Sequence, residues 1–196
     1  MKKIIFASLL FLGYLQSNAQ VTFRPGVRTG ANFSKITDTD SDFKPDFYLG
    51  IYGALKLSKF YVFQPELSYT RQGANNVSSY DFDQVNQQYV ARKVDISNAF
   101  VTLGITNKFY LNEKVNINIS PTIDLMLDPD EYTDSELDLA ISLGAGYKIA
   151  RNLEAEIRFK KGLVDTFMAN HSYALNQTNT NFLFQLGLAY TFDFKK

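Results

Sequence analysis

The stretch at residues 181–194, NFLFQLGLAYTFDF, decides the fold class because its side chains alternate in character. Its even positions are all large and apolar, whereas its odd positions are mostly small or polar. A period of two is typical of a β-strand that has one apolar face and one polar face. Which face meets water then distinguishes a soluble sandwich, a ligand-binding barrel and a membrane barrel.

The same alternation recurs along the chain and predicts eight strands. Their expected ranges are 21–33, 47–57, 60–71, 90–111, 115–127, 137–149, 153–162 and 180–194. The fourth range is irregular, because its apolar residues are even-numbered at Val94 and Ile96 but odd-numbered at Val101, Leu103 and Ile105. We therefore expect a β-bulge or a late strand start there.

The connections between these strands alternate between two lengths. Tight turns are expected at 58–59, 112–114 and 150–152. Longer segments rich in Asn, Asp, Ser, Thr and Gln lie at 34–46, 72–89, 128–136 and 163–179. This alternation is typical of an up-and-down antiparallel barrel whose two ends face different compartments. With eight strands, both ends of the barrel chain lie on the side of the tight turns.

A Leu-Gly pair recurs in every second predicted strand, at 49–50, 103–104, 143–144 and 186–187. Each Leu falls on the apolar face and each Gly on the opposite face. We interpret the pairs as a weak repeat of hairpins in which glycine makes space for long charged neighbours across the lumen.

Side-chain volume decides which face is inside. Roughly three dozen bulky apolar side chains would have to fill an interior that holds little more than a column of side chains. The opposite face is rich in small residues and carries charges of both signs, which can pair inside the barrel. We therefore predict that the apolar faces meet lipid. The charged residues expected to face the lumen are Arg24, Arg28, Lys56, Glu66, Lys108, Asp124, Glu154, Glu156, Arg158, Lys160 and Asp193.

Aromatic residues gather near both ends of the predicted strands, as in the interfacial belts of outer-membrane barrels. Those toward the tight turns are Phe60, Tyr61, Phe63, Phe109, Phe192 and Phe194. Those toward the longer segments are Phe47, Tyr69, Phe182 and Phe184.

The N-terminal segment has the composition of a secretory signal peptide. Two lysines precede an apolar run at 4–15 that is too short to span a membrane, and small residues precede a cleavage point after Ala19. We expect a signal peptide at 1–19 and one outer-membrane β-barrel domain at 20–196. The sequence has no cysteine for a disulfide framework, and its formal net charge of zero gives no support for nucleic-acid binding.

Several segments resemble the Bacteroidetes-type outer-membrane β-barrel domain family, whose members are described as porin-family or PorT-like proteins. They are SNAQ at the cleavage point, FRPGVRTGANFS, FYLGIYGALKLSKFYVFQPELSYTRQG, ISLGAGYKIARNLEAEIRFKKGL and FQLGLAYTF. The most family-like piece is FQPELSYTRQG, at 63–73. The resemblance implies an outer-membrane location and a barrel fold more than a particular task.

The segments on the loop side contain one candidate for a catalytic residue. The single histidine, His171, precedes Ser172 in the polar segment 163–179, and adjacent residues seldom direct their side chains at each other. We expect a solvated loop histidine and no enzyme.

Two acidic segments are candidates for a metal site. Asp38, Asp40 and Asp42 begin like a calcium loop, but Phe43 and Leu49 stand where such a loop needs Gly and a bidentate Glu. Loose divalent-cation binding here, or in DPDEYTDSE at 128–136, is the alternative to solvated loops. The sequence therefore assigns no catalytic, cofactor-binding or metal residue, and no cofactor is expected.

Together these features predict an all-β, eight-stranded antiparallel up-and-down transmembrane β-barrel in the outer membrane of a Gram-negative bacterium. Short turns are expected in the periplasm and four longer loops outside, where a structural or surface-interaction role would reside. The expected partners are outer-membrane lipid, lipopolysaccharide, the barrel-assembly machinery during folding, and a surface or secretion partner. A PorT-like secretion or envelope-assembly component, a narrow porin-like pore and a soluble ligand-binding barrel are the alternatives.

Overall fold

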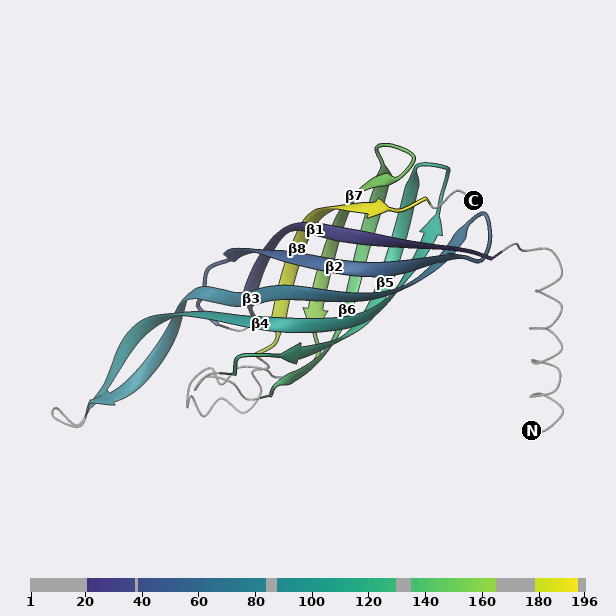
Figure 1. Cartoon of the computed structure of the whole chain (residues 1–196). Helices are drawn as coiled ribbons and strands as arrows, with labels where there is room; N and C mark the ends of the chain where they lie inside the picture. Colours follow the sequence, from purple (N-terminus) through teal and green to yellow (C-terminus); the bar gives the residue numbers. More distant parts are fainter. Residues whose placement is uncertain (1–20, 38, 84–87, 130–134, 165–178, 194–196) are drawn as a thin grey trace, which may run out of the picture.

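The computed structural model of the protein describes residues 21–37, 39–83, 88–129, 135–164 and 179–193. Eight antiparallel strands form one closed barrel in sequence order, as predicted (Figure 1). They are β1 (Thr22–Ile36), β2 (Lys44–Lys56), β3 (Tyr61–Asp83), β4 (Gln88–Tyr110), β5 (Val115–Met126), β6 (Leu137–Lys148), β7 (Leu153–Gly162) and β8 (Asn181–Thr191). Pairing of β1 with β8, from Gly26 opposite Thr191 to Ile36 opposite Asn181, closes the ring.

Alternation along each strand sorts side chains between the lumen and the outside. In β5 the even-numbered residues from Asn116 to Met126 are buried, whereas Ile117, Ile123 and Leu125 are exposed. The terminal strand β8 follows the same rule, because Leu186, Leu188 and Tyr190 point outward. Among the described residues, no helix has the length and apolar character needed to cross a membrane. The alternation of buried and exposed residues in these strands confirms their predicted facing.

The four Leu-Gly pairs take the predicted positions. The leucines at 49, 103, 143 and 186 are exposed, and the glycines that follow them face inward. A Cβ atom at Gly187 would overlap the hydroxyl of Tyr48, and one at Gly144 would lie 2.8 Å from Cγ of Arg158. Absence of a side chain at these positions leaves room for large lumen residues, as expected.

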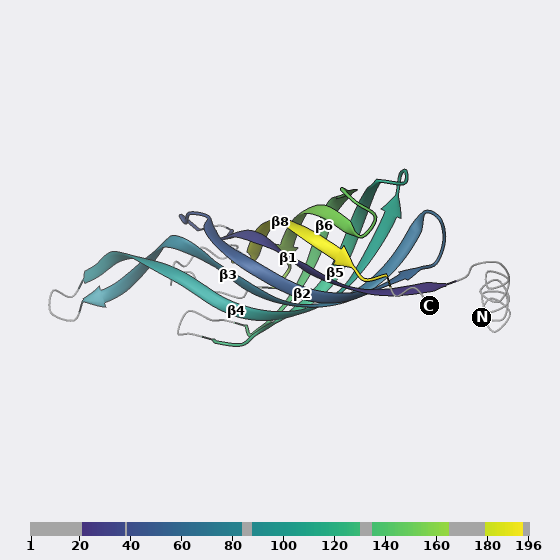
Figure 2. The same ribbon diagram turned by 45° about the horizontal axis from the view of Figure 1, so that its top comes forward.

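The third connection differs from the prediction. The segment 72–89, expected as a long loop, continues both β3 and β4, which pair from Tyr61 opposite Phe109 to Asp83 opposite Gln88. Figures 1 and 2 show this β3–β4 hairpin projecting past the other strands on the side of the longer connections. A two-stranded ribbon outside the barrel has no core face, so its strands need no apolar alternation and their polar composition resembles a loop.

The predicted bulge in the fourth strand was wrong, and so was the late start, because β4 begins at Gln88. The irregularity lies in β3, where Ala74 pairs with Ile96 but Val77 pairs with Val94, so that β3 contains one extra residue. Within this bulge Asn76 has a φ of 56°, in the left-handed region that Asn tolerates. The even-numbered residues of β4 from Val94 to Lys108 all face inward, so the strand does not change its facing. Ile96 joins an apolar cluster in the lumen.

Aromatic rings form two groups on the outer face. Near the loop end, Phe33 and Phe159 each contact Phe184, with ring centroids 6.1 and 5.0 Å apart, respectively. Near the turn end, Tyr61 contacts Phe109 at 5.3 Å. The predicted belts have this placement, except that Phe194 lies outside the described residues, as does the predicted signal peptide.

Candidate functional site

Six charged side chains meet in the middle of the lumen, and we call them the central ion-pair network. They come from β1, β3, β4 and β7, so the network reaches across the barrel. All six are buried, with at most 7% of the residue exposed. Three are cationic and three are acidic: Arg28, Lys108, Arg158, Glu66, Glu154 and Glu156.

Two glutamates link the cations of this network. Oε1 of Glu66 accepts hydrogen bonds from Nη1 of Arg28 at 2.9 Å and from Nη1 of Arg158 at 2.8 Å. Glu156 lies 2.8 Å from Nζ of Lys108, 3.2 Å from Arg158 and 3.4 Å from Arg28. Each cation therefore has at least one carboxylate within ion-pair distance.

The turn end of the network is completed by Glu154. Nζ of Lys108 donates to Glu154 at 2.7 Å, and the Tyr110 hydroxyl donates to the same carboxylate at 3.3 Å. Tyr48 lies against the other end of the network, with Cζ of Arg28 4.8 Å from its ring centroid. The six side chains are buried and fill this level of the lumen. Their charges balance, as buried charges require.

The loop half of the lumen is filled differently. Lys160 pairs with Asp124, which also accepts a hydrogen bond from Thr102 at 2.7 Å and one from Gln72 at 3.3 Å. Beyond this pair lies an apolar cluster that the sequence did not predict. Its members are Ile36, Ala74, Val77, Ile96, Phe100 and Met126.

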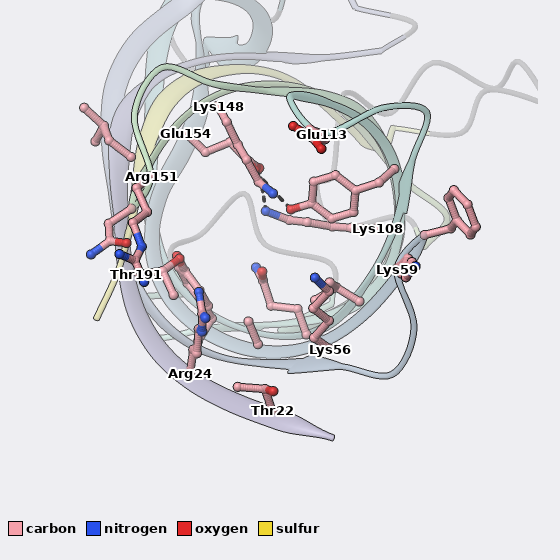
Figure 3. A pocket seen from close by; sticks show the side chains of 18 of the residues that line it. Thr22, Arg24, Lys56, Lys59, Lys108, Glu113, Lys148, Arg151, Glu154 and Thr191 are labelled. Atoms are coloured by element: carbon pink, nitrogen blue, oxygen red, sulfur yellow. Dashed lines mark hydrogen bonds and ion pairs between the residues drawn. The ribbon is translucent and has the colours of Figure 1, made fainter. Parts of the chain in front are cut away.

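The turn end of the lumen is open, and we call it the turn-side vestibule. It is a cavity of about 680 Å³ whose lining includes Lys108 and Glu154 of the central ion-pair network. Figure 3 shows these two residues together with Lys148 inside the ring of strands, with Arg24 and Lys56 reaching in from another part of the wall. Six cationic and two acidic side chains line the cavity, namely Arg24, Lys56, Lys59, Lys108, Lys148, Arg151, Glu113 and Glu154.

The structure brings six of the eleven predicted lumen charges together in the central ion-pair network, and it pairs Lys160 with Asp124 nearer the loops. Of the candidate loop residues, only some lie in the described part of the chain. His171, Ser172 and Asp38 lie outside the described residues. Asp42 accepts a hydrogen bond from Asn76 at 2.8 Å, which links the segment before β2 to the bulge of β3. Among the described residues, no group of three or more His, Cys, Asp or Glu side chains is arranged to hold a metal ion.

An apolar outer face, two aromatic groups and a lumen whose middle is occupied by paired charges define an integral membrane β-barrel. The family model described as the outer membrane protein beta-barrel domain matches residues 4–192. The chain belongs to this family and is an outer-membrane β-barrel protein. No curated protein matches the chain.

Three solved barrels are similar to this chain in shape. Ail, the attachment invasion locus protein of Yersinia pestis, is 12% identical with a TM-score of 0.49, and the match covers 86% of this chain and 98% of Ail. Neisserial surface protein A is 9% identical with a TM-score of 0.49, covering 87% of this chain and 97% of that one. The N-terminal barrel domain of Pseudomonas aeruginosa OprF is 12% identical with a TM-score of 0.46, covering 87% and 100%. The family assignment rests on the family model and not on these likenesses.

Proposed function

We propose that this protein is a closed outer-membrane anchor that presents its β3–β4 hairpin at the cell surface for interaction with other molecules. The observation that carries this proposal is the length of the hairpin beyond its neighbours. Pairing of β2 with β3 ends at Tyr48 opposite Thr70, and pairing of β4 with β5 ends at Phe100 opposite Met126. Past the bulge, β3 and β4 continue as a two-stranded ribbon from Val77 to Asp83, which corresponds to about 20 Å at about 3.3 Å per residue.

The base of the hairpin is well fixed. The backbones of Asp42 and Asn75 exchange hydrogen bonds of 2.8 and 3.0 Å, and the Asn76 amide donates to Asp95 at 2.9 Å. Ala74, on the same strand, packs into the apolar cluster of the lumen. A ribbon held in this way suits a binding surface, because little conformational freedom at its base is lost on binding.

The contents of the lumen argue against the narrow pore that the sequence left open. The central ion-pair network spans the lumen, and an apolar cluster occupies the loop end. Lumens of eight-stranded barrels are filled by side chains, whereas aqueous channels belong to larger barrels. We propose that the protein has no enzymatic activity and does not conduct ions at rest.

The remaining parts of the proposal follow from the barrel class. The signal peptide at 1–19 would direct export, the barrel-assembly machinery would insert the domain at 20–196, and the tight turns would face the periplasm. Lipopolysaccharide would surround the half of the barrel that faces the outside of the cell. A PorT-like secretion component remains the second candidate from the sequence resemblance, and it predicts co-purification with other envelope proteins.

The experiment compares cells that produce the full-length protein with cells that produce a variant whose residues 79–92 are replaced by an Asn-Gly turn. A variant shortened at 130–134, in the third predicted loop, is the matched control. Protease added to intact cells should cut the hairpin of the full-length and control proteins, whereas the shortened variant has no hairpin to cut. Attachment of cells to one another and to protein-coated surfaces should fall in the shortened variant alone. Equal attachment of all three strains, at equal amounts of folded barrel, would contradict the proposal.

A further inference from the structure

Six cationic side chains line the turn-side vestibule, against two carboxylates, Glu113 and Glu154, with Asp193 at its edge. Asp193 pairs with Arg151 at 2.9 Å and with Arg24 at 3.6 Å, and Glu154 pairs with Lys108 at 2.7 Å. No ion pair within the described part of the chain engages the three remaining lysines. These are Lys56, Lys59 and Lys148.

Lys148 shows the imbalance most clearly. Its Nζ lies 4.1 Å from the centroid of the Tyr110 ring and has no carboxylate within ion-pair distance among the described residues. Partial burial disfavours the charge of Lys148 most strongly. Glu154 attracts this charge, and Lys56, Lys108 and Arg24 each repel it more weakly. Like charges held together in a cavity destabilise one another unless an anion enters between them.

We propose that the vestibule binds a soluble, phosphate-bearing small molecule. A volume of about 680 Å³ is within the range of small-molecule sites. The cations without a carboxylate partner are lysines, which bind phosphate as compact point charges. The buried amide of Gln64 and the exposed side chain of Asn112 add polar groups to the lining.

The position of the vestibule selects a soluble ligand over a lipid headgroup. The lining residues that belong to strands lie inside a closed ring of eight paired strands, which separates this part of the cavity from the acyl chains. The cavity opens between the tight turns, because residues of three turns, Lys59, Glu113 and Arg151, belong to its lining. Location of the site in the periplasm rests on the proposed orientation of the barrel, but binding itself does not.

The test is calorimetric titration of the purified full-length barrel in a neutral, phosphate-free detergent at low ionic strength. Inorganic pyrophosphate is the probe, and citrate is the comparator. The double variant K56Q/K148Q should bind pyrophosphate about tenfold more weakly than the wild type. The variant K44Q/K93Q removes the same charge at the loop end, farther from the vestibule than electrostatic interactions reach through the salt solution. Its affinity for pyrophosphate should stay within about twofold of the wild-type value. Gel mobility with and without heating confirms that all proteins are folded.

Three results would overturn the assignment. They are absence of pyrophosphate binding to the wild type, equal loss in both double variants, and tighter binding of citrate than of pyrophosphate. Repeating the titration in nanodiscs of phosphatidylglycerol separates the two sources of phosphate. Unchanged affinity supports a soluble ligand, whereas lost affinity shows that lipid headgroups fill the site. Protease accessibility on intact cells tests the orientation separately, so a failure of binding and a failure of the proposed function are distinguishable.

Discussion

Replacement of Glu156 by Gln tests whether the central ion-pair network stabilises the barrel. Only 1% of the Glu156 side chain is exposed, and three cations lie within 3.4 Å of its carboxylate. The substitution keeps the shape of the side chain but leaves three buried cations facing two carboxylates. Removal of one partner from a buried pair costs about 3–5 kcal/mol, because the remaining charge stays desolvated. We expect the free energy of unfolding to fall by this amount.

The assay is urea unfolding of the barrel in lipid vesicles. The sequence contains no tryptophan, so circular dichroism and gel mobility of unheated samples serve as the readouts. The control is Asp193→Asn, which removes a carboxylate that pairs with Arg24 and Arg151, whose side chains are 41% and 67% exposed. Loss of such a surface pair costs about 0–1 kcal/mol.

A second variant separates charge imbalance from simple loss of contacts. With Glu156 and Arg158 both changed to Gln, Arg28 keeps Glu66 at 2.9 Å and Lys108 keeps Glu154 at 2.7 Å. The double variant should therefore be more stable than E156Q alone. The reasoning is refuted if E156Q lowers the free energy of unfolding no more than D193N does. It is also refuted if the double variant is less stable than both E156Q and R158Q.

Three further predictions use the same unfolding assay. Gly187→Ala should cost about 1–3 kcal/mol, because the added Cβ would overlap the Tyr48 hydroxyl and lie 2.5 Å from a carbonyl oxygen of β1; an unchanged midpoint would contradict the space-making role of this glycine. Leu143→Lys, in the middle of the outer face of β6, should cost about 2–4 kcal/mol, whereas Leu111→Lys at the turn end should cost at most about 1 kcal/mol. Replacement of 79–92 by Asn-Gly should leave the unfolding midpoint unchanged, since the barrel strands retain their pairing; a large loss would show that the hairpin stabilises the barrel.

The outer face of the barrel was predictable from the sequence because lipid imposes one simple demand on every outward position. Leu186, Leu188 and Tyr190 have to be apolar whatever their neighbours are, so a period of two identifies them without knowledge of the fold. The charged residues of the lumen were predicted for the same reason, as the complement of that pattern.

Partners inside the lumen were not predictable, because they depend on strands far apart in the sequence. Arg158 meets Glu66 across 92 positions of the chain, and no local pattern indicates which carboxylate it will face. The apolar loop end was missed because Ile96 and Phe100 lie on the polar face of β4, where periodicity predicted a change of facing. Only the arrangement of the whole ring shows that these residues pack with Met126.

The two ends of the lumen differ in a way that fits different roles. At the loop end, Ala74 and Val77 from the hairpin pack with Ile36 and Phe100 from the barrel, so the lumen core holds the base of the projecting ribbon. At the turn end, the lumen is open and basic. The central ion-pair network lies between them and separates the two. A ligand in the vestibule would therefore reach the hairpin only by rearranging buried charges such as Glu156, whose loss of partners is costly. We therefore expect the two proposed activities, surface binding by the hairpin and anion binding in the vestibule, to be only weakly coupled.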